Sequence, residues 1–174
     1  KCGITDYVEL ILQDFEKLGH EIERYFIKQG CRELTDLPSA DIYSIQFAPY
    51  AYSKYGTTNR VLNQLEKKLQ NQKVHLTFHE IWVGAYPRAS WKEKTIGWLQ
   101  KNIILSFVNK CKPALITSSN DAAIDRLNHA GVSANFLYLF GNIPYSSTSK
   151  VAVIGHTLKV AFFGTLYTDF PYDE

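Results

Sequence analysis

The sequence contains no methionine, has only three cysteines in 174 residues, and carries only a small excess of positive charge, +2. Three scattered cysteines give neither a metal-binding spacing nor an even-numbered disulfide framework, which favours a reducing compartment. A charge this small, with no run of lysine or arginine, argues against a nucleic-acid partner. No apolar run is long enough for a transmembrane helix, and no signal peptide is visible. We therefore expect a cytoplasmic protein.

Several catalytic motifs are absent as well. His79-Glu80 lacks the second histidine of a zinc-protease motif, because position 83 is Val83. The other histidines show no ligand spacing, so no metal site is expected. There is no Gly-x-Ser-x-Gly elbow and no Walker A pattern, which argues against an α/β-hydrolase and a P-loop enzyme. An epimerase or dehydrogenase would need a Gly-x-Gly-x-x-Gly loop, and this pattern does not occur either.

What the sequence does contain is an alternation of short apolar segments with amphipathic ones. With 45% hydrophobic and 21% charged residues, the chain has enough apolar side chains for a sizeable core. Alternating strands and helices predict an α/β fold, a Rossmann-like three-layer sandwich with a mostly parallel sheet and helices on both faces. Strands are expected at 41–47, 74–78, 114–117 and 135–140, with a further candidate at 21–27, and helices at 8–18, 61–69, 91–110 and 121–131.

The segment 74–82 carries the strongest candidate for a functional residue. It is a short apolar strand with His79 and Glu80 at its carboxyl end, and open α/β sheets bind ligands outside the carboxyl ends of their strands. A structural histidine that is merely hydrogen-bonded at a strand end remains an alternative. Gln46 and Tyr50, at the end of another predicted strand, offer hydrogen bonding and stacking to a sugar ring, or are ordinary packing. Near the amino terminus, Thr5 or Asp6 is expected to cap the first helix.

Together these segments resemble retaining glycosyltransferases of family 4, which have the GT-B architecture of two facing Rossmann-like domains. The resemblance covers almost the whole chain in the right order, although each motif is short. The matching stretches are Cys2-Gly3-Ile4-Thr5-Asp6-Tyr7, Leu18-Gly19-His20-Glu21-Ile22, Phe78-His79-Glu80, Ile116-Thr117-Ser118-Ser119, Phe140-Gly141-Asn142-Ile143-Pro144 and Phe162-Phe163-Gly164-Thr165-Leu166.

The resemblance implies how the chain is divided. Residues 1–150 would be the N-terminal, acceptor-binding Rossmann-like domain, with its first strand missing upstream. Residues 151–174 would be a linker and the first strand of a truncated donor-binding domain. Because the chain also begins without methionine, we expect a fragment that does not transfer sugar alone, cut from a hexosyl- or other glycosyltransferase of cell-envelope polysaccharide biosynthesis.

The resemblance also implies the residues of the site. His79 and Glu80 would be catalytic, with His79 hydrogen-bonded to the donor sugar and Glu80 orienting His79 or the following loop. Residues expected to bind donor or acceptor are Gly3, Ile4, Asp6, Gln46, Tyr50, Ser118, Asn142, Gly164 and Thr165.

The implied partners are a nucleotide sugar as co-substrate and a saccharide or lipid-linked acceptor. Transfer would retain the anomeric configuration, with neither a bound metal nor a prosthetic group. Peripheral association of the full-length protein with the inner face of the membrane is implied too. Two other interpretations of the sequence remain open: a non-catalytic α/β binding module and a nucleotide-sugar-modifying Rossmann enzyme.

Overall fold

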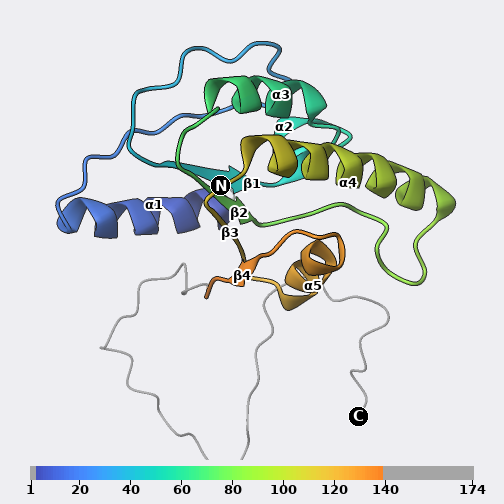
Figure 1. Cartoon of the computed structure of the whole chain (residues 1–174). Helices are drawn as coiled ribbons and strands as arrows, with labels where there is room; N and C mark the ends of the chain where they lie inside the picture. The colour runs from blue at the N-terminus through green and yellow to red at the C-terminus, as the bar shows by residue number, and fades with distance from the viewer. Residues whose placement is uncertain (1–2, 139–174) are drawn as a thin grey trace, which may run out of the picture. The chain divides into compact units, whose positions relative to one another are not determined.

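The computed structural model describes residues 3–138. Within this range four parallel strands form one sheet, and their order in the sheet follows their order in the chain (Figure 1). The strands are β1 (Tyr43–Phe47), β2 (Val74–Phe78), β3 (Leu115–Ser118) and β4 (Asn135–Phe136). This arrangement confirms the predicted α/β class and the parallel sheet.

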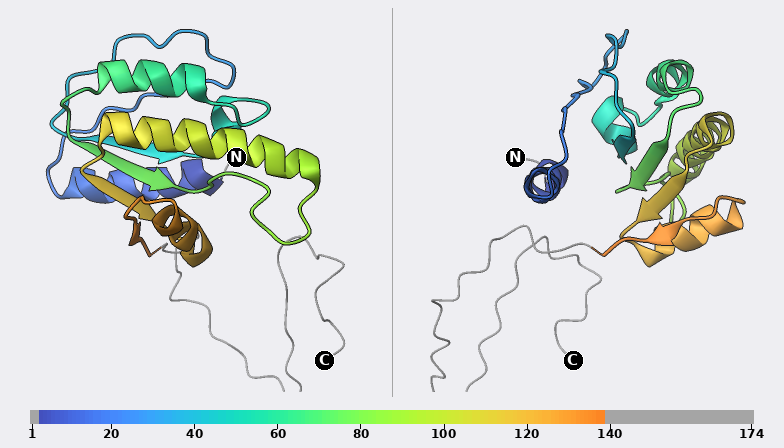
Figure 2. Two further views of the ribbon diagram at one scale, coloured as in Figure 1. Left: turned by 45° about the vertical axis from the view of Figure 1, so that its right-hand side comes forward. Right: turned by 60° about the vertical axis from the view of Figure 1, so that its left-hand side comes forward.

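Helices flank the sheet on both faces. Helices α3, α4 and α5, one in each connection between successive strands, lie on one face, as right-handed crossovers in a sequential sheet require, while α1 lies on the other face (Figure 2). The helices are α1 (Gly3–Lys17), α2 (Pro49–Tyr52), α3 (Asn59–Lys68), α4 (Trp91–Cys111) and α5 (Asp121–His129). The result is the expected three-layer arrangement.

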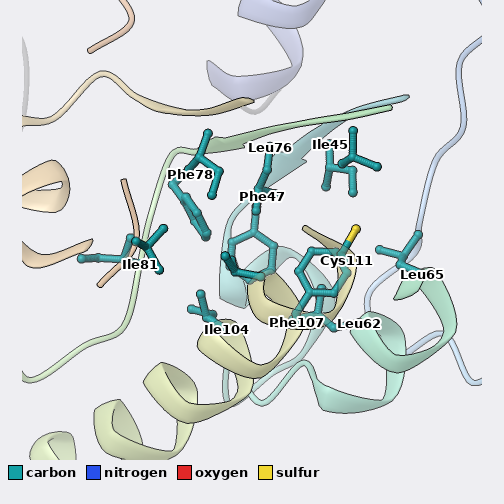
Figure 3. Close-up of a cluster of buried hydrophobic side chains, with 14 of the residues drawn as sticks. Ile45, Phe47, Leu62, Leu65, Leu76, Phe78, Ile81, Ile104, Phe107 and Cys111 are labelled. Atoms are coloured by element: carbon teal, nitrogen blue, oxygen red, sulfur yellow. The ribbon is translucent and has the colours of Figure 1, made fainter. Parts of the chain in front are cut away.

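The hydrophobic core fills the space between the sheet and helices α3 and α4 (Figure 3). Side chains alternate between the two faces of a strand, so Val74, Leu76 and Phe78 of β2 all enter this core and are almost completely buried. Phe78 meets Phe47 of β1 edge to face, with ring centroids 5.3 Å apart. The intervening residues of both strands therefore face α1 instead.

Helix α4 begins where the sequence predicts it, because Ser90 and Glu93 form a reciprocal capping box. It approaches the preceding loop so closely that a Cβ on Gly97 would lie 1.9 Å from the carbonyl oxygen of Val83. Gln100, 1% exposed, accepts a hydrogen bond from the Val83 backbone N–H at 2.9 Å. The loop after β2 is thereby fixed to α4 by a glycine contact and a buried amide.

Three expectations need correction. Residues 21–27 do not form a strand; Arg24 instead pairs with Glu9 of α1 at 2.8 Å, and Ile27 packs against the core from an irregular segment. Helix α1 begins at Gly3, so Thr5 and Asp6 lie inside its first turn rather than at its cap.

The fourth strand is shorter than predicted. Only Asn135–Phe136 is a strand, although the Leu137 backbone N–H still donates to the Ser118 carbonyl at 2.9 Å. The remainder of the expected 135–140 strand continues into residues outside the described range. The expected domain boundary at 150, and the linker and strand expected in residues 151–174, also lie outside that range.

Candidate functional site

His79 occupies the position immediately after β2. Its backbone N–H donates to the Phe47 carbonyl at 2.9 Å, which continues the pairing of β1 and β2 one step beyond Phe78. Because Phe78 enters the core, the next side chain projects to the opposite face of the sheet. The backbone geometry therefore places the imidazole of His79 at the carboxyl edge, on the face that α1 covers.

Two segments that are distant in the sequence, β1 and α1, contact this imidazole. Gln46 of β1 places its amide oxygen 2.7 Å from His79 Nε2. Tyr7 of α1 contacts the imidazole ring edge to face, with ring centroids 5.8 Å apart and planes at 77°. Gln46 was a predicted site residue, and the structure brings it to His79. Tyr7 was missed, although it extends the helical stripe through Ile11 by one further turn.

The protonation state of His79 follows from these surroundings. Burial lowers the pKa of the imidazole below its ordinary value, so the ring is neutral near neutral pH. An amide oxygen can only accept a hydrogen bond, so Nε2 carries the hydrogen and Nδ1 carries the lone pair. In this state His79 presents a hydrogen-bond acceptor, whereas donation from its other nitrogen would need a second proton.

A row of polar side chains continues from Gln46 across the same face. Gln46 Nε2 donates to Ser44 Oγ at 3.1 Å, and Ser44 Oγ lies 3.3 Å from His75 Nδ1. The strand register explains the row, because Ser44 lies opposite His75 in the pairing of β1 and β2. Burial lowers the pKa of His75 as well. The sequence shows no metal-ligand spacing around His75, and no role was predicted for it.

The row ends at two buried threonines. His75 Nε2 lies 3.0 Å from Thr117 Oγ1 of β3 and 3.2 Å from Thr77 Oγ1, and the two hydroxyl oxygens are 3.1 Å apart. Thr77 and Thr117 occupy paired positions in the register of β2 and β3. Within residues 3–138 no buried side-chain nitrogen or oxygen lacks a hydrogen-bond partner, so the buried polar atoms of this face are satisfied.

The other predicted residues lie at varying distances from this centre. Glu80 is exposed to solvent, and none of the hydrogen bonds found for His79 within the described range involves it. Gly3, Ile4 and Asp6 form the first turn of α1, directly before Tyr7, and thus lie on the segment that contacts His79.

Tyr50 and Ser118 have other neighbours. The Tyr50 hydroxyl lies 3.5 Å from Gln100 Nε2 of α4, on the core side of the sheet. Ser118 is fully buried, and its hydroxyl donates to the Phe78 carbonyl at 2.9 Å. In this conformation Ser118 joins β3 to β2 and does not reach solvent. Asn142, Gly164 and Thr165 lie outside the described residues.

A shallow groove of about 370 Å³ lies elsewhere, against α4 and α5. It is lined by Trp82, Lys101, Ala122, Asp125, Arg126 and His129. Lys101 Nζ lies 5.6 Å from the centroid of the Trp82 ring. Both helices are on the core side of the sheet (Figure 2), so this groove is separate from the His79 centre.

Among residues 3–138 no three or more histidine, cysteine, aspartate or glutamate side chains are grouped to hold a metal ion. No helix in that range is both long and apolar enough to span a bilayer. No protein-family model matches the sequence, and comparisons with curated proteins and with solved structures found no match.

Proposed function

We propose that this chain is the acceptor-side half of a retaining glycosyltransferase of GT-B architecture, which transfers a sugar from a nucleotide sugar to a saccharide or lipid-linked acceptor. One observation carries the proposal. A neutral histidine stands at the carboxyl edge of an all-parallel sheet, with its ring held by Gln46 and Tyr7. This edge is where open α/β sheets bind ligands. The resemblance to family 4 implies that the same histidine would hydrogen-bond the donor sugar.

The state of His79 suits a sugar ligand. Its Nδ1 lone pair accepts a hydrogen bond from a sugar hydroxyl, while Gln46 occupies Nε2. Transfer of a glycosyl group passes through a transition state with positive charge at the anomeric carbon. An imidazole kept neutral by burial avoids placing a second positive charge beside it. A hydrogen bond accepted from the hydroxyl makes the sugar oxygen more electron-rich and so stabilises that transition state.

The test is His79→Ala in the full-length protein, with turnover of a nucleotide-sugar donor and the melting temperature measured together. Loss of one preorganised hydrogen bond in a transition state typically costs about 2.7–4 kcal/mol, or roughly a hundred- to a thousand-fold in turnover. We expect a loss of at least about tenfold with little change in melting temperature, because the backbone pairing of residue 79 remains.

A matched control is His20→Ala, because His20 is exposed and contacts only Phe15 of α1 in the ring contacts of the described residues. Its turnover should equal that of the wild type. A folded His79→Ala protein with unchanged turnover contradicts the proposed role of His79. A wild-type protein that turns over no sugar nucleotide but binds a sugar or protein ligand supports the non-catalytic binding module instead.

We also propose that the exposed side of α4 binds an anionic membrane surface. Trp91 and Trp98 are 73% and 64% exposed, and they lie seven residues apart on one helical face. Lys94 lies between them on the same face, and Lys92 Nζ is 5.8 Å from the centroid of the Trp91 ring. Indole rings and lysines together favour the headgroup region of anionic bilayers.

Sedimentation with vesicles tests this partner. The chain should bind vesicles that contain phosphatidylglycerol and bind neutral phosphatidylcholine vesicles weakly. Trp91→Ser combined with Trp98→Ser should weaken the binding at least about tenfold, because both indoles would lie at the interface. The control is Tyr55→Ser, since Tyr55 is 65% exposed and also has a lysine, Lys54, over its ring. Equal binding by the double variant and the wild type would exclude α4 as the membrane contact.

A further inference from the structure

His75 of β2 and His79, which follows that strand, are joined by a continuous hydrogen-bonded row. It runs from His79 to Gln46, from Gln46 to Ser44 and from Ser44 to His75, with heavy-atom distances of 2.7, 3.1 and 3.3 Å. At the end of the row, His75 Nε2 lies 3.0 Å from Thr117 Oγ1. Each member offers a fixed number of hydrogens and lone pairs, so the direction of one hydrogen bond constrains the next.

The direction can be followed from the amide of Gln46. Its oxygen faces His79 Nε2 and its NH₂ group faces Ser44 Oγ. The separation of 2.7 Å at His79 is within the range of an N–H···O hydrogen bond. Ser44 accepts from Gln46, and Ser44 Oγ lies 3.3 Å from His75 Nδ1, to which it can donate its single hydroxyl hydrogen. When His75 carries its hydrogen on Nε2, next to the Thr117 hydroxyl, its Nδ1 takes the Ser44 hydrogen, and Ser44 can then only accept from Gln46.

We infer that His75 is a positioning residue, which acts through Ser44 and Gln46 to hold His79 in the tautomer with hydrogen on Nε2 and a lone pair on Nδ1. With hydrogen on Nδ1, His75 would donate to Ser44. The Ser44 hydroxyl hydrogen would then be free for the Gln46 amide oxygen, and the amide could turn that oxygen away from His79. The reversed row would leave His79 with hydrogen on Nδ1. The tautomer of His75 thus biases the tautomer of His79.

The consequence is a choice of ligand chemistry. In the direction shown by the structure, His79 offers an acceptor, which suits a ligand hydroxyl or another hydrogen-bond donor. In the reversed direction it would offer a donor, which suits a carbonyl or phosphate oxygen. His75 does not touch the ligand, because Ser44 and the two threonines occupy its nitrogens. This inference concerns hydrogen positions in the chain and stands or falls independently of sugar transfer.

The experiment is a long-range ¹H–¹⁵N correlation spectrum of the chain with ¹⁵N-labelled histidine at slightly alkaline pH, where neutral rings dominate. Signals are assigned by their loss in His75→Asn and His79→Asn. We expect His79 with hydrogen on Nε2 in the wild type. In Ser44→Ala the ratio of the two His79 tautomers should fall by roughly two- to tenfold, the equilibrium worth of one neutral hydrogen bond.

Two further variants separate positioning from a general loss of structure. Ser44→Thr keeps the hydroxyl and should restore the wild-type ratio, while Ser106→Ala, at an exposed serine of α4, should not change it. Ser44 is exposed, so its substitution leaves the core intact, and the backbone amide spectrum verifies this. Hydrogen on Nδ1 of wild-type His79 overturns the inference. A tautomer ratio in Ser44→Ala equal to that of the wild type overturns it too.

Discussion

The imidazoles of His75 and His79 have different hydrogen-bonding capacities because their partners differ. His75 has Ser44 at one nitrogen and the threonine hydroxyls at the other, so its hydrogen-bonding capacity is used inside the protein. Within the described residues His79 has a hydrogen bond only at Nε2, with Gln46, and none at Nδ1. Burial lowers the pKa of both. The arrangement of neighbours, and not the residue type, therefore distinguishes the two histidines and supports the proposed role of His79.

The partners also explain why a polar row is tolerated in the middle of a parallel sheet. Thr77 and Thr117 are 2% and 4% exposed, and a buried hydroxyl without a partner would cost about 1–3 kcal/mol. Here each hydroxyl has at least two neighbours at hydrogen-bonding distance. The two buried hydroxyls and the His75 imidazole thus satisfy one another within the sheet.

At the level of elements, α1 differs from the other long helix, α4. Only Tyr7 of its fifteen residues is buried, and Phe15 and Leu18 at its carboxyl end are 46% and 73% exposed. Its charged link to the following segment, Arg24 with Glu9, is partly exposed, and exposed ion pairs contribute little to stability. Helix α4 buries six residues. We therefore expect α1 to be the less stable of the two.

Hydrogen exchange of the native protein measures this difference. Amides of α1 should exchange at least about a hundredfold faster than those in the buried half of α4, because few apolar contacts oppose local opening. Tyr7→Ala should increase the exchange of α1 and leave α4 unchanged, while Phe15→Ala, at a more exposed position, should have the smaller effect. Equal protection of the two helices in the wild type would show that α1 is held by contacts other than Tyr7.

Local periodicity was sufficient to predict most elements. The predicted helix 91–110 is found at Trp91–Cys111, and the predicted strand 74–78 is found at Val74–Phe78, because one pattern repeats at helical spacing and the other is a short apolar run. The segment 21–27 has a strand-like pattern too. A strand also needs a neighbour to pair with, and Arg24 in this segment binds α1 instead.

The site was predictable only in part, because it too depends on pairing between segments that are distant in the sequence. A strand end and its fold class point to His79 and Gln46, but the pairing of the two depends on the register between β1 and β2. The role of His75 depends on that register as well, and on its bonds to Thr117 across β3. Residues 31 and 42 positions apart come together there, and no local pattern contains this information.

The sheet within residues 3–138 has one apolar and one polar face, and the polar face makes the stability of the protein sensitive to acid. Folding holds His75 and His79 in surroundings that disfavour the charged form. The unfolded chain, with a histidine pKa of about 6.5, therefore binds protons at a pH where the folded chain does not. Stability is fully present above about pH 6.5 and falls as the pH decreases toward the lower folded-state pKa values.

We therefore expect the free energy of unfolding, measured with urea from about pH 8 to pH 5, to be flat above about pH 7 and to decrease below about pH 6.5. Each histidine can contribute at most about 1.4 kcal/mol per pH unit, and less in practice because both rings are only partly buried. The double variant His75→Asn with His79→Asn lacks both titrating groups, so its stability should vary less over this range. Above about pH 7 the wild type and the double variant should show the same flat dependence, which serves as the internal control. An acid slope that is equally steep in both proteins would assign the effect to other groups and remove the two histidines from the pH dependence of folding.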